Sequence, residues 1–407
     1  MVLLFTEENF KKLSQELDVI LADSTDAQKH PDSYASGVVS GVTNQHEVEI
    51  LKALGYKNLE SKEPMQTDSL FCIFSCTKAV VSTGLLQLWE RGLLDLDAPA
   101  KNYLPRISKL GKLKGLNHDN TPLFEKPKVD ITTRMLLTHT SGLGYTFFSD
   151  EYEKVDSAIG EPSFENFSEK SLDGSFLLFE PGTQWMYGMG IDWAGKVLEA
   201  ITGKSLGEYL KDNILEPAHM DSSTFHVLDE KDKKRLVTLY SRTKDGLVPF
   251  RHQPPTDPSL DIGGHGLFST VEDYLKFIRI WLNDGKTSEG VPIISEKTFK
   301  YAIQNHLPSD LHVKSLKSYK AELSKDIPTD PSLKPNDWTL CFALNGDDLP
   351  TGRPKGSLYW CGLSNLFYWI DLKNKIGGFY ASQIYPLGDD SAATSYKVES
   401  TVYKYLE

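Results

Sequence analysis

The chain has 407 residues, of which 40% are apolar, 25% charged and 11% aromatic. This balance is typical of a globular protein with a large core, and the length predicts about two or three folding units. Lys and Arg number 44 against 56 Asp and Glu, so the net charge is −12 and no basic stripe is present for a nucleic acid. The sequence also lacks the run of about 18 apolar residues that a membrane-spanning helix needs. Acidic residues follow the start too soon for a signal peptide. We therefore expect a cytoplasmic protein that binds neither nucleic acid nor membrane.

The first hundred residues predict a helix, a hairpin and a second helix. Apolar residues recur at helical spacing over residues 5–25. Two short apolar runs within residues 36–57 flank a polar turn and predict a β-hairpin. Residues 75–91 are again helical in pattern, and Gly92 is the predicted stop.

The middle of the chain is mostly helical in pattern and is broken by loops. Helices are predicted at 191–201 and 206–214, whereas the Lys- and Gly-rich residues 106–130 have no clear period and predict a surface excursion. Ser269 followed by Glu272 has the spacing of a capping box and predicts the start of another helix.

The C-terminal part alternates as strands do. After a long loop at 307–337, residues 356–371 and 376–385 are strand-like, and 392–406 predicts a last helix. Strands therefore cluster at both ends of the chain. The simplest architecture is a discontinuous α/β domain of residues 1–92 and 266–407, interrupted by a helical domain of residues 93–265.

The four cysteines, Cys72, Cys76, Cys341 and Cys361, are too few for a disulfide framework. The spacing of Cys72 and Cys76 would allow them to share one helix face. No CxxC or HExxH pattern accompanies them. We expect free thiols and no metal site.

Two Ser-x-x-Lys patterns occur, Ser75–Lys78 and Ser241–Lys244. On a helix this spacing puts the amine one turn from the hydroxyl, where a neutral lysine can activate the serine. Ser75 follows an apolar run and opens a predicted helix, whereas Lys244 runs into an Asp-Gly turn and is expected to be solvated. Taken alone, Ser75 is equally well interpreted as a helix-capping serine.

Other nucleophile and nucleotide patterns are absent. The sequence has no Gly-x-Ser-x-Gly, no P-loop and no complete dinucleotide loop. His139 suggests a Ser-His pair, but a packed histidine whose ring hydrogen-bonds backbone at a helix end is the better interpretation.

Six ordered segments resemble the serine β-lactamase-related family, and the resemblance covers nearly the whole chain, from about residue 36 to 385. This family includes class C β-lactamases, related esterases and, as the most similar branch, the lovastatin-pathway acyltransferase. The segments are FSCTKAV (74–80), ERGLLDLDAPAKNYLP (90–105), ITTRMLLTHTSGL (131–143), EPGTQWMYGMGIDWAGKVLEAITG (180–203), IGGHGLFSTVEDYLKF (262–277) and SLYWCGLSNLFYWID (357–371). The resemblance implies the β-lactamase and penicillin-binding-protein fold, an antiparallel sheet flanked by helices with an inserted helical domain and the active site between the two.

The resemblance also implies roles for particular residues. Ser75 falls on the nucleophile, Lys78 on its partner and Tyr187 on the tyrosine that shares the proton work, without deciding which of the two is the primary base. The backbone N–H groups of Ser75 and Leu363 would form the oxyanion hole. Gly362 would leave room for the substrate carbonyl.

Two departures from the lactamases stand out. Met189 replaces an Asn two residues after the tyrosine, and Trp360-Cys361-Gly362 replaces Lys-Thr-Gly, whose polar side chains help to bind the lactam carboxylate. We therefore expect little or no β-lactamase activity and a fairly apolar, aromatic pocket. Its predicted substrate-binding residues are Tyr145, His265, Trp360, Cys361, Gly362 and Tyr385.

The predicted function is a serine ester hydrolase or acyltransferase that works through an acyl-enzyme and needs no cofactor. Its partners would be a small ester or thioester as acyl donor and water or an alcohol as acceptor. The alternatives are a catalytically silent binding or scaffold member of the fold, and a β-lactamase or peptidase. The sequence indicates neither the physiological substrate nor the oligomeric state.

Overall fold

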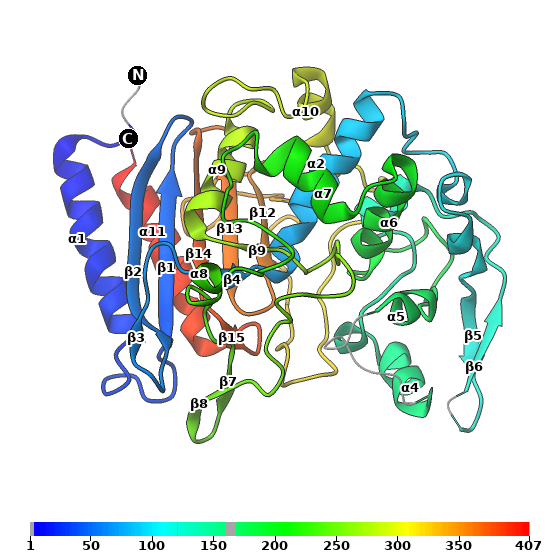
Figure 1. Cartoon of the computed structure of the whole chain (residues 1–407), viewed down its shortest axis with the longest axis horizontal. Coiled ribbons are helices and arrows are strands. Elements are labelled where there is room, and N and C mark those ends of the chain that lie inside the picture. Colours follow the sequence, from blue (N-terminus) through cyan, green and yellow to red (C-terminus); the bar gives the residue numbers. More distant parts are fainter. Residues whose placement is uncertain (1–3, 120, 160–167, 407) are drawn as a thin grey trace.

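An antiparallel sheet built from both ends of the chain stands in the left half of the molecule as viewed in Figure 1. The computed structural model describes residues 4–119, 121–159 and 168–406. The sheet order is β10-β11-β12-β13-β14-β1-β2-β3, so the N-terminal hairpin pairs with the C-terminal meander through β1 and β14. Its strands are β1 (Gly37–Thr43), β2 (Val48–Asn58), β3 (Glu63–Pro64), β10 (Asp337–Trp338), β11 (Ala343–Leu344), β12 (Leu358–Gly362), β13 (Leu366–Asp371) and β14 (Ile376–Ala381).

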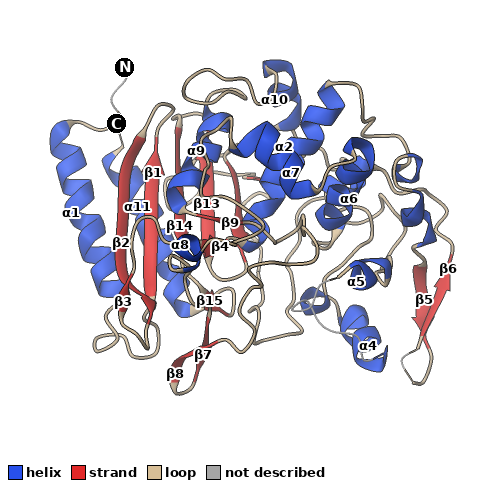
Figure 2. Cartoon of the chain, viewed as in Figure 1, coloured by secondary structure: helices blue, strands red, loops and turns tan. Residues whose placement is uncertain are grey.

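Helices cover both faces of this sheet (Figure 2). Helices α1 (Glu7–Ser24) and α11 (Ala393–Tyr405) pack side by side on one face, and α9 (Val271–Leu282) lies on the other. Alternation along β1 matches these two layers, because Val38 contributes to the cluster beneath α1 and α11 while Val39 contributes to the main core. Gly41 allows the close approach of α9, since a Cβ there would lie 2.6 Å from a methyl group of Leu275.

Helix α2 (Thr77–Glu90) is buried on all sides between the sheet and the helical half of the molecule. Residues 77–88 are all buried, and α2 packs against α6 (Gly190–Thr202) and α7 (Leu206–Leu210). A helix without a solvent face needs apolar or hydrogen-bonded side chains all round. Its N-terminal end is therefore a dry site for any polar group placed there.

The remaining elements are short. The helices are α3 (Thr133–Leu137), α4 (Asp150–Ile159), α5 (Glu169–Asp173), α8 (Glu230–Lys233), α10 (Glu296–Ala302) and a π-helical turn (Lys211–Leu215). The strands are β4 (Phe71–Cys72), β5 (Lys112–Leu116), β6 (Pro122–Glu125), β7 (Tyr240–Thr243), β8 (Gly246–Pro249), β9 (Phe268–Ser269) and β15 (Ile384–Tyr385). No helix in the described part of the chain is long and apolar enough to cross a membrane.

Most predicted elements are confirmed, and four details are corrected. The helix at 271–282 is capped by Thr270, whose hydroxyl accepts from the N–H of Asp273, so the predicted Ser269 cap was one residue early. The excursion at 106–130 contains the hairpin β5–β6. The stretch 356–371 is two strands, because Asn365 (φ 64°) closes a three-residue turn.

The fourth correction concerns the cysteines. Cys72 lies on β4 and Cys76 in the turn before α2, so they do not share a helix face. All four cysteines are free thiols. The division into domains of 1–92 with 266–407 and of 93–265 stays a prediction, since the main core runs through both ranges.

Candidate active site

Ser75 lies in a 3₁₀ turn, Phe74–Cys76, that leads directly into α2. It is therefore not the N-cap of the helix, as the capping interpretation required, because α2 begins at Thr77. The turn is strained, since Phe74 has φ of 43°, a left-handed conformation that bulky residues rarely adopt. Two hydrogen bonds hold the C-terminal end of this turn. The Tyr274 hydroxyl donates to the Cys76 carbonyl (2.9 Å), and the Thr77 hydroxyl accepts from the Leu267 N–H (3.1 Å).

The amine of Lys78 lies beside this serine and is buried. Lys78 Nζ donates to Ser75 Oγ (3.2 Å), to the Tyr145 hydroxyl (3.1 Å) and to the Gly264 carbonyl (2.7 Å). An ammonium has three N–H donors. All three are thus used when Lys78 is charged, and one of them is directed at the serine.

A buried carboxylate, Asp192 on α6, completes this network. Tyr145 donates its hydroxyl proton to Asp192 Oδ2 (2.9 Å), and the Gly264 N–H donates to Asp192 Oδ1 (2.9 Å). His265 Nδ1 lies 3.6 Å from Oδ1. A charged carboxylate this deeply buried needs such partners to offset the cost of its desolvation.

Burial shifts the pKa values of Lys78 and Asp192 toward neutral pH. Desolvation lowers the pKa of Lys78 to about 8, and the nearby charge of Asp192 opposes that shift. Desolvation raises the pKa of Asp192, with Lys78 and the Tyr145 hydroxyl acting in the other direction. A lysine with a pKa about 8 exists in part as the neutral amine near physiological pH, which a general base requires.

Tyr187 faces the same serine from the loop before α6. Its hydroxyl hydrogen-bonds Ser75 and accepts from the indole N–H of Trp360 (3.0 Å). The Tyr187 ring centroid lies 4.8 Å from Lys78 Nζ. Burial raises the pKa of Tyr187 well above its ordinary value, and its hydrogen bonds to Ser75 and Trp360 lower it in part. At neutral pH the group is therefore a phenol that can give up a proton only to a strong base.

The predicted oxyanion-hole residues, Ser75 and Leu363, line one small cavity together. Among the described residues, the Leu363 amide makes no main-chain hydrogen bond outside the helices and strands. Gly362 also has a reason within the protein itself: a Cβ there would lie 2.6 Å from the carbonyl oxygen of Ile73. Gly362 thus lets the end of β12 approach the chain segment that carries Ser75.

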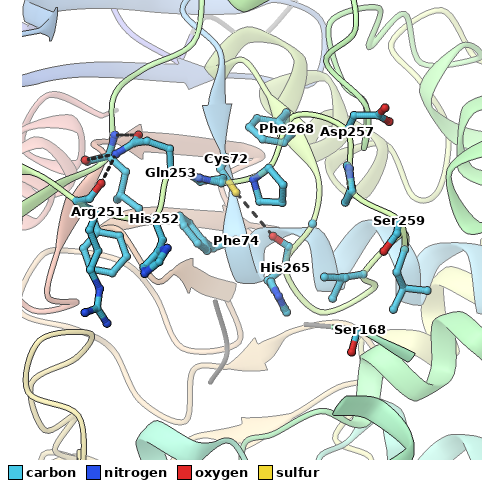
Figure 3. Close-up of a pocket in the computed structure, with 18 of the residues that line it drawn as sticks. Cys72, Phe74, Ser168, Arg251, His252, Gln253, Asp257, Ser259, His265 and Phe268 are labelled. Carbon is cyan, nitrogen blue, oxygen red and sulfur yellow. Dashed lines mark hydrogen bonds between the residues drawn. The ribbon is translucent and has the colours of Figure 1, made fainter. Parts of the chain in front are cut away.

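Two cavities of very different size flank the nucleophile segment. The small one, about 20 Å³, contains Ser75 and Tyr187 and is closed by the apolar side chains of Phe147, Phe148, Leu316, Ile327 and Leu387. The large one, about 620 Å³, has Phe74 and His265 in its lining (Figure 3). Phe250 and Tyr385 also line it, and the Tyr385 ring packs against Phe74 with centroids 5.7 Å apart. Adjacent residues of the chain, Phe74 and Ser75, thus border the two cavities.

The six residues predicted to bind substrate are distributed unevenly. Trp360 and Cys361 line the cavity of Ser75, whereas His265 and Tyr385 line the large one. The Tyr145 hydroxyl is instead buried between Lys78 and Asp192, so its geometry supports a role behind the lysine rather than a substrate contact. Burial raises the pKa of the Cys361 thiol to about 12, which agrees with a packing role.

Sequence reasoning missed Asp192 and Gly264. A signal was available for Asp192, because it interrupts an otherwise apolar run, Ile191-Asp-Trp-Ala194, on a helix. The signal for Gly264 is only visible in three dimensions, since a Cβ there would overlap both carboxylate oxygens of Asp192.

The other side chains considered as catalytic groups or metal ligands have weaker structural support. His139 is packed against the rings of Tyr187 and Trp338, with centroids 4.6 and 4.8 Å away. Neither ring nitrogen of His139 has a hydrogen-bond partner among the described residues, which corrects the predicted bond to backbone. Ser241 and Lys244 belong to the β7–β8 hairpin, and Lys244 is exposed. Across residues 4–119, 121–159 and 168–406, no three His, Cys, Asp or Glu side chains converge as metal ligands do.

Comparisons with known proteins give a family match over most of the chain. The model of the Beta-lactamase family matches residues 22–402. Lovastatin esterase of Penicillium rubens is 32% identical over 84% of this chain and 87% of its own length, and acyltransferase calJ of Penicillium decumbens is 30% identical over 84% and 82%.

Solved structures share the fold. A variant of simvastatin synthase from Aspergillus terreus has a TM-score of 0.80 at 24% identity, covering 96% of this chain and 95% of the other. EstCE1, described as a hydrolase with promiscuous acyltransferase activity, has a TM-score of 0.76 at 21% identity, with 98% and 100% covered. The predicted fold class, an antiparallel sheet flanked by helices as in β-lactamases and penicillin-binding proteins, is confirmed.

Proposed function

The chain belongs to the beta-lactamase family, and from this premise we propose that it is a serine esterase or acyltransferase in which Ser75 carries the acyl group. The observation that carries the proposal is the 3.2 Å contact between Lys78 Nζ and Ser75 Oγ inside a buried hydrogen-bond network. A serine hydroxyl is a weak nucleophile until a base removes its proton. Lys78, with a pKa about 8, is such a base.

Acylation begins when neutral Lys78 takes the proton of Ser75 as Oγ attacks the carbonyl carbon of the ester. The carbonyl oxygen becomes an oxyanion, which accepts hydrogen bonds from the amides of Ser75 and Leu363. When the bond to the leaving alkoxide breaks, that oxygen takes the phenol proton of Tyr187. The products of this half-reaction are an acyl-Ser75 ester, the Lys78 ammonium, the Tyr187 phenolate and the free alcohol.

Deacylation reverses the two proton transfers. The Tyr187 phenolate takes a proton from water or from an acceptor alcohol as that oxygen attacks the acyl carbon. The Lys78 ammonium then returns its proton to Ser75 Oγ when the acyl group leaves. Every proton is accounted for, and the enzyme ends with the neutral amine and the phenol with which it started.

The two cavities suggest which end of the ester each one takes. The small cavity, which contains Ser75, would hold the acyl group, and its size favours short acyl chains. The large aromatic cavity beside Phe74 and His265 would hold the alcohol part or the acceptor. A small ester or thioester is therefore the proposed donor, and water or an alcohol is the proposed acceptor.

The test is the intact mass of the protein after incubation with p-nitrophenyl acetate, with release of p-nitrophenol followed in parallel. We expect an initial burst and an added acetyl mass in the wild type and in S241A, which removes the serine of the second Ser-x-x-Lys pattern. We expect neither in S75A. Faster turnover on addition of an alcohol would favour transfer over hydrolysis.

The alternatives give different results in the same experiment. A silent scaffold would show no adduct and would also fail to react with a fluorophosphonate probe. A β-lactamase would turn over a chromogenic cephalosporin, which we do not expect, because Trp360-Cys361 lacks the cationic and hydroxyl side chains that bind the lactam carboxylate.

A further inference from the structure

The hydrogen bonds around Lys78 leave its amine only one direction in which to lose a proton. Two of the three N–H groups are fixed on oxygens that do not react, the Gly264 carbonyl (2.7 Å) and the Tyr145 hydroxyl (3.1 Å). The third points at Ser75 Oγ (3.2 Å). When Lys78 is neutral, its lone pair therefore replaces the N–H that faced the serine.

This arrangement depends on which way the proton of Tyr145 points. A tyrosine hydroxyl is both donor and acceptor, and it could offer its proton to the lysine instead. Asp192 prevents this, because its Oδ2 accepts the Tyr145 proton at 2.9 Å and an ionised carboxylate has no proton to return. Tyr145 can then only accept from Lys78, and the lone pair of the amine stays directed at Ser75.

The backbone of Gly264 connects Lys78 with Asp192. Its carbonyl accepts from Lys78, and its N–H donates to Asp192 Oδ1 (2.9 Å). The carboxylate is thus fixed on both oxygens, with Tyr145 on one and Gly264 on the other. Rotation of the carboxylate would break both bonds at once.

We propose that Asp192 and Tyr145 are positioning residues for the acylation step, which direct the lone pair of Lys78 at Ser75 and set the pH at which the amine loses its proton. The inference rests on the proposed function, since it requires Lys78 to act as the base. Neither residue touches the ester in this scheme. Both act through the lysine.

The electrostatics of the site agree with this assignment. The titratable groups that face Lys78 and Asp192 are the following: Tyr145, Tyr187, His139, His265, Cys76 and Cys361. Burial lowers the pKa of both histidines and raises the pKa of both thiols and both phenols, so all six are neutral near pH 7. Asp192 is thus the anion among the described groups around Lys78, and its charge opposes the loss of the lysine proton.

The D192N variant separates these effects. An Asn that still accepts from Gly264 turns its NH₂ group toward Tyr145, so the Tyr145 proton would turn toward Lys78 and compete for the lone pair. We expect the limiting acylation rate to fall by about tenfold to a hundredfold. Loss of the negative charge should also move the acidic limb of the pH–rate profile to lower pH, by about 1 to 3 pH units.

The Y145F variant keeps the carboxylate and removes only the hydroxyl between it and the lysine. We expect a smaller shift in the same direction and a smaller loss of rate. It also provides a second test if D192N does not fold. The matched control is D371N, which alters another hydrogen bond from a tyrosine to a buried aspartate, that from the partly buried Tyr403 to Asp371 (3.0 Å), at the end of β13.

The experiment measures the burst rate with p-nitrophenyl acetate from pH 5 to 10 for the wild type and the three variants, and the acetyl adduct on Ser75 by mass. A lower-pH limb with a reduced plateau in D192N, and an unchanged profile in D371N, would support the inference. Profiles of D192N and Y145F that superimpose on the wild type, or an equal shift in D371N, would overturn it. The absence of any Ser75 adduct in the wild type would instead overturn the proposed function.

Discussion

The indole N–H of Trp360 donates a 3.0 Å hydrogen bond to the hydroxyl oxygen of Tyr187. Trp360 is the first residue of the segment that stands where related lactamases have Lys-Thr-Gly. An indole N–H is a donor only, so it cannot take the Tyr187 proton. It instead stabilises the phenolate that the proposed mechanism forms when the leaving alcohol is protonated.

Replacement of Trp360 by Phe should therefore lower kcat more than it changes KM. The phenyl ring retains part of the contact with Trp338 (centroids 4.7 Å apart) but has no N–H donor. A hydrogen bond to a charged group is worth about 1.5–3 kcal/mol, so we expect kcat to fall by about tenfold to a hundredfold. Steady-state kinetics with ethyl acetate measure this, because its strongly basic alkoxide must take the Tyr187 proton as it leaves and acylation is then the slow step; W89F is the control, because Trp89 stacks on Tyr301. A higher KM at constant kcat would show that Trp360 only contacts the substrate.

The acylation rate of the wild type should rise with pH and level off above about pH 8. The neutral form of Lys78 is the active one, and burial lowers the pKa of this amine to about 8. Below that pH the protonated fraction grows, so the rate should fall by about tenfold for each pH unit. The burst rate measured between pH 6 and 10 checks this, and K78R, whose guanidinium stays protonated, should show no burst. A rate that decreases as the pH rises through 8 would contradict the assignment of Lys78 as base.

Replacement of Gly264 by Ala should damage both stability and activity. The added Cβ would overlap both carboxylate oxygens of Asp192, which are held by Tyr145 and by Gly264 itself. Overpacking of this kind costs about 1–3 kcal/mol, so we expect Tm to fall by several degrees and acylation to slow at least as much as in D192N. Thermal unfolding and burst kinetics measure the two effects. G115A is the control, since a Cβ at Gly115 would meet no atom within 4 Å.

Local pattern predicted most elements of this fold but only part of its site. The spacing of Ser75 and Lys78 is visible in the sequence because both lie within one turn of the chain. Tyr145 and Lys78 are 67 residues apart, and their hydrogen bond exists only because the fold brings the loop after α3 to the start of α2. Such a contact leaves no local pattern, which explains why Tyr145 was predicted as a pocket residue rather than as a partner of the lysine.

The same limit applies to the roles of small residues. The sequence predicts a steric reason for the glycine at 362 and none for the glycine at 264, because such a reason depends on which atoms lie across from the residue. For Gly362 the nearest atom is the Ile73 carbonyl oxygen, 2.6 Å from the position of an added Cβ, and the predicted room for the substrate carbonyl stays a prediction. The helix cap at Thr270 rather than Ser269 is a similar case, since both residues fit the local pattern and tertiary packing selects one.

The size of the Ser75 cavity should set the length of the acyl chain. Its volume of about 20 Å³ is near that of a single water site, and Leu316 is one of the apolar side chains that close it. Truncation in L316A should therefore favour longer acyl groups, because room for each methylene is worth about 1–3 kcal/mol in discrimination. We expect the ratio of kcat/KM for p-nitrophenyl butyrate to that for the acetate to rise by about tenfold or more. L311A, a buried leucine not among those that line this cavity, is the control for a general loss of packing. An unchanged ratio in L316A would mean that the acyl chain lies elsewhere, and the large cavity beside Phe74 would then be the site to test by the same approach.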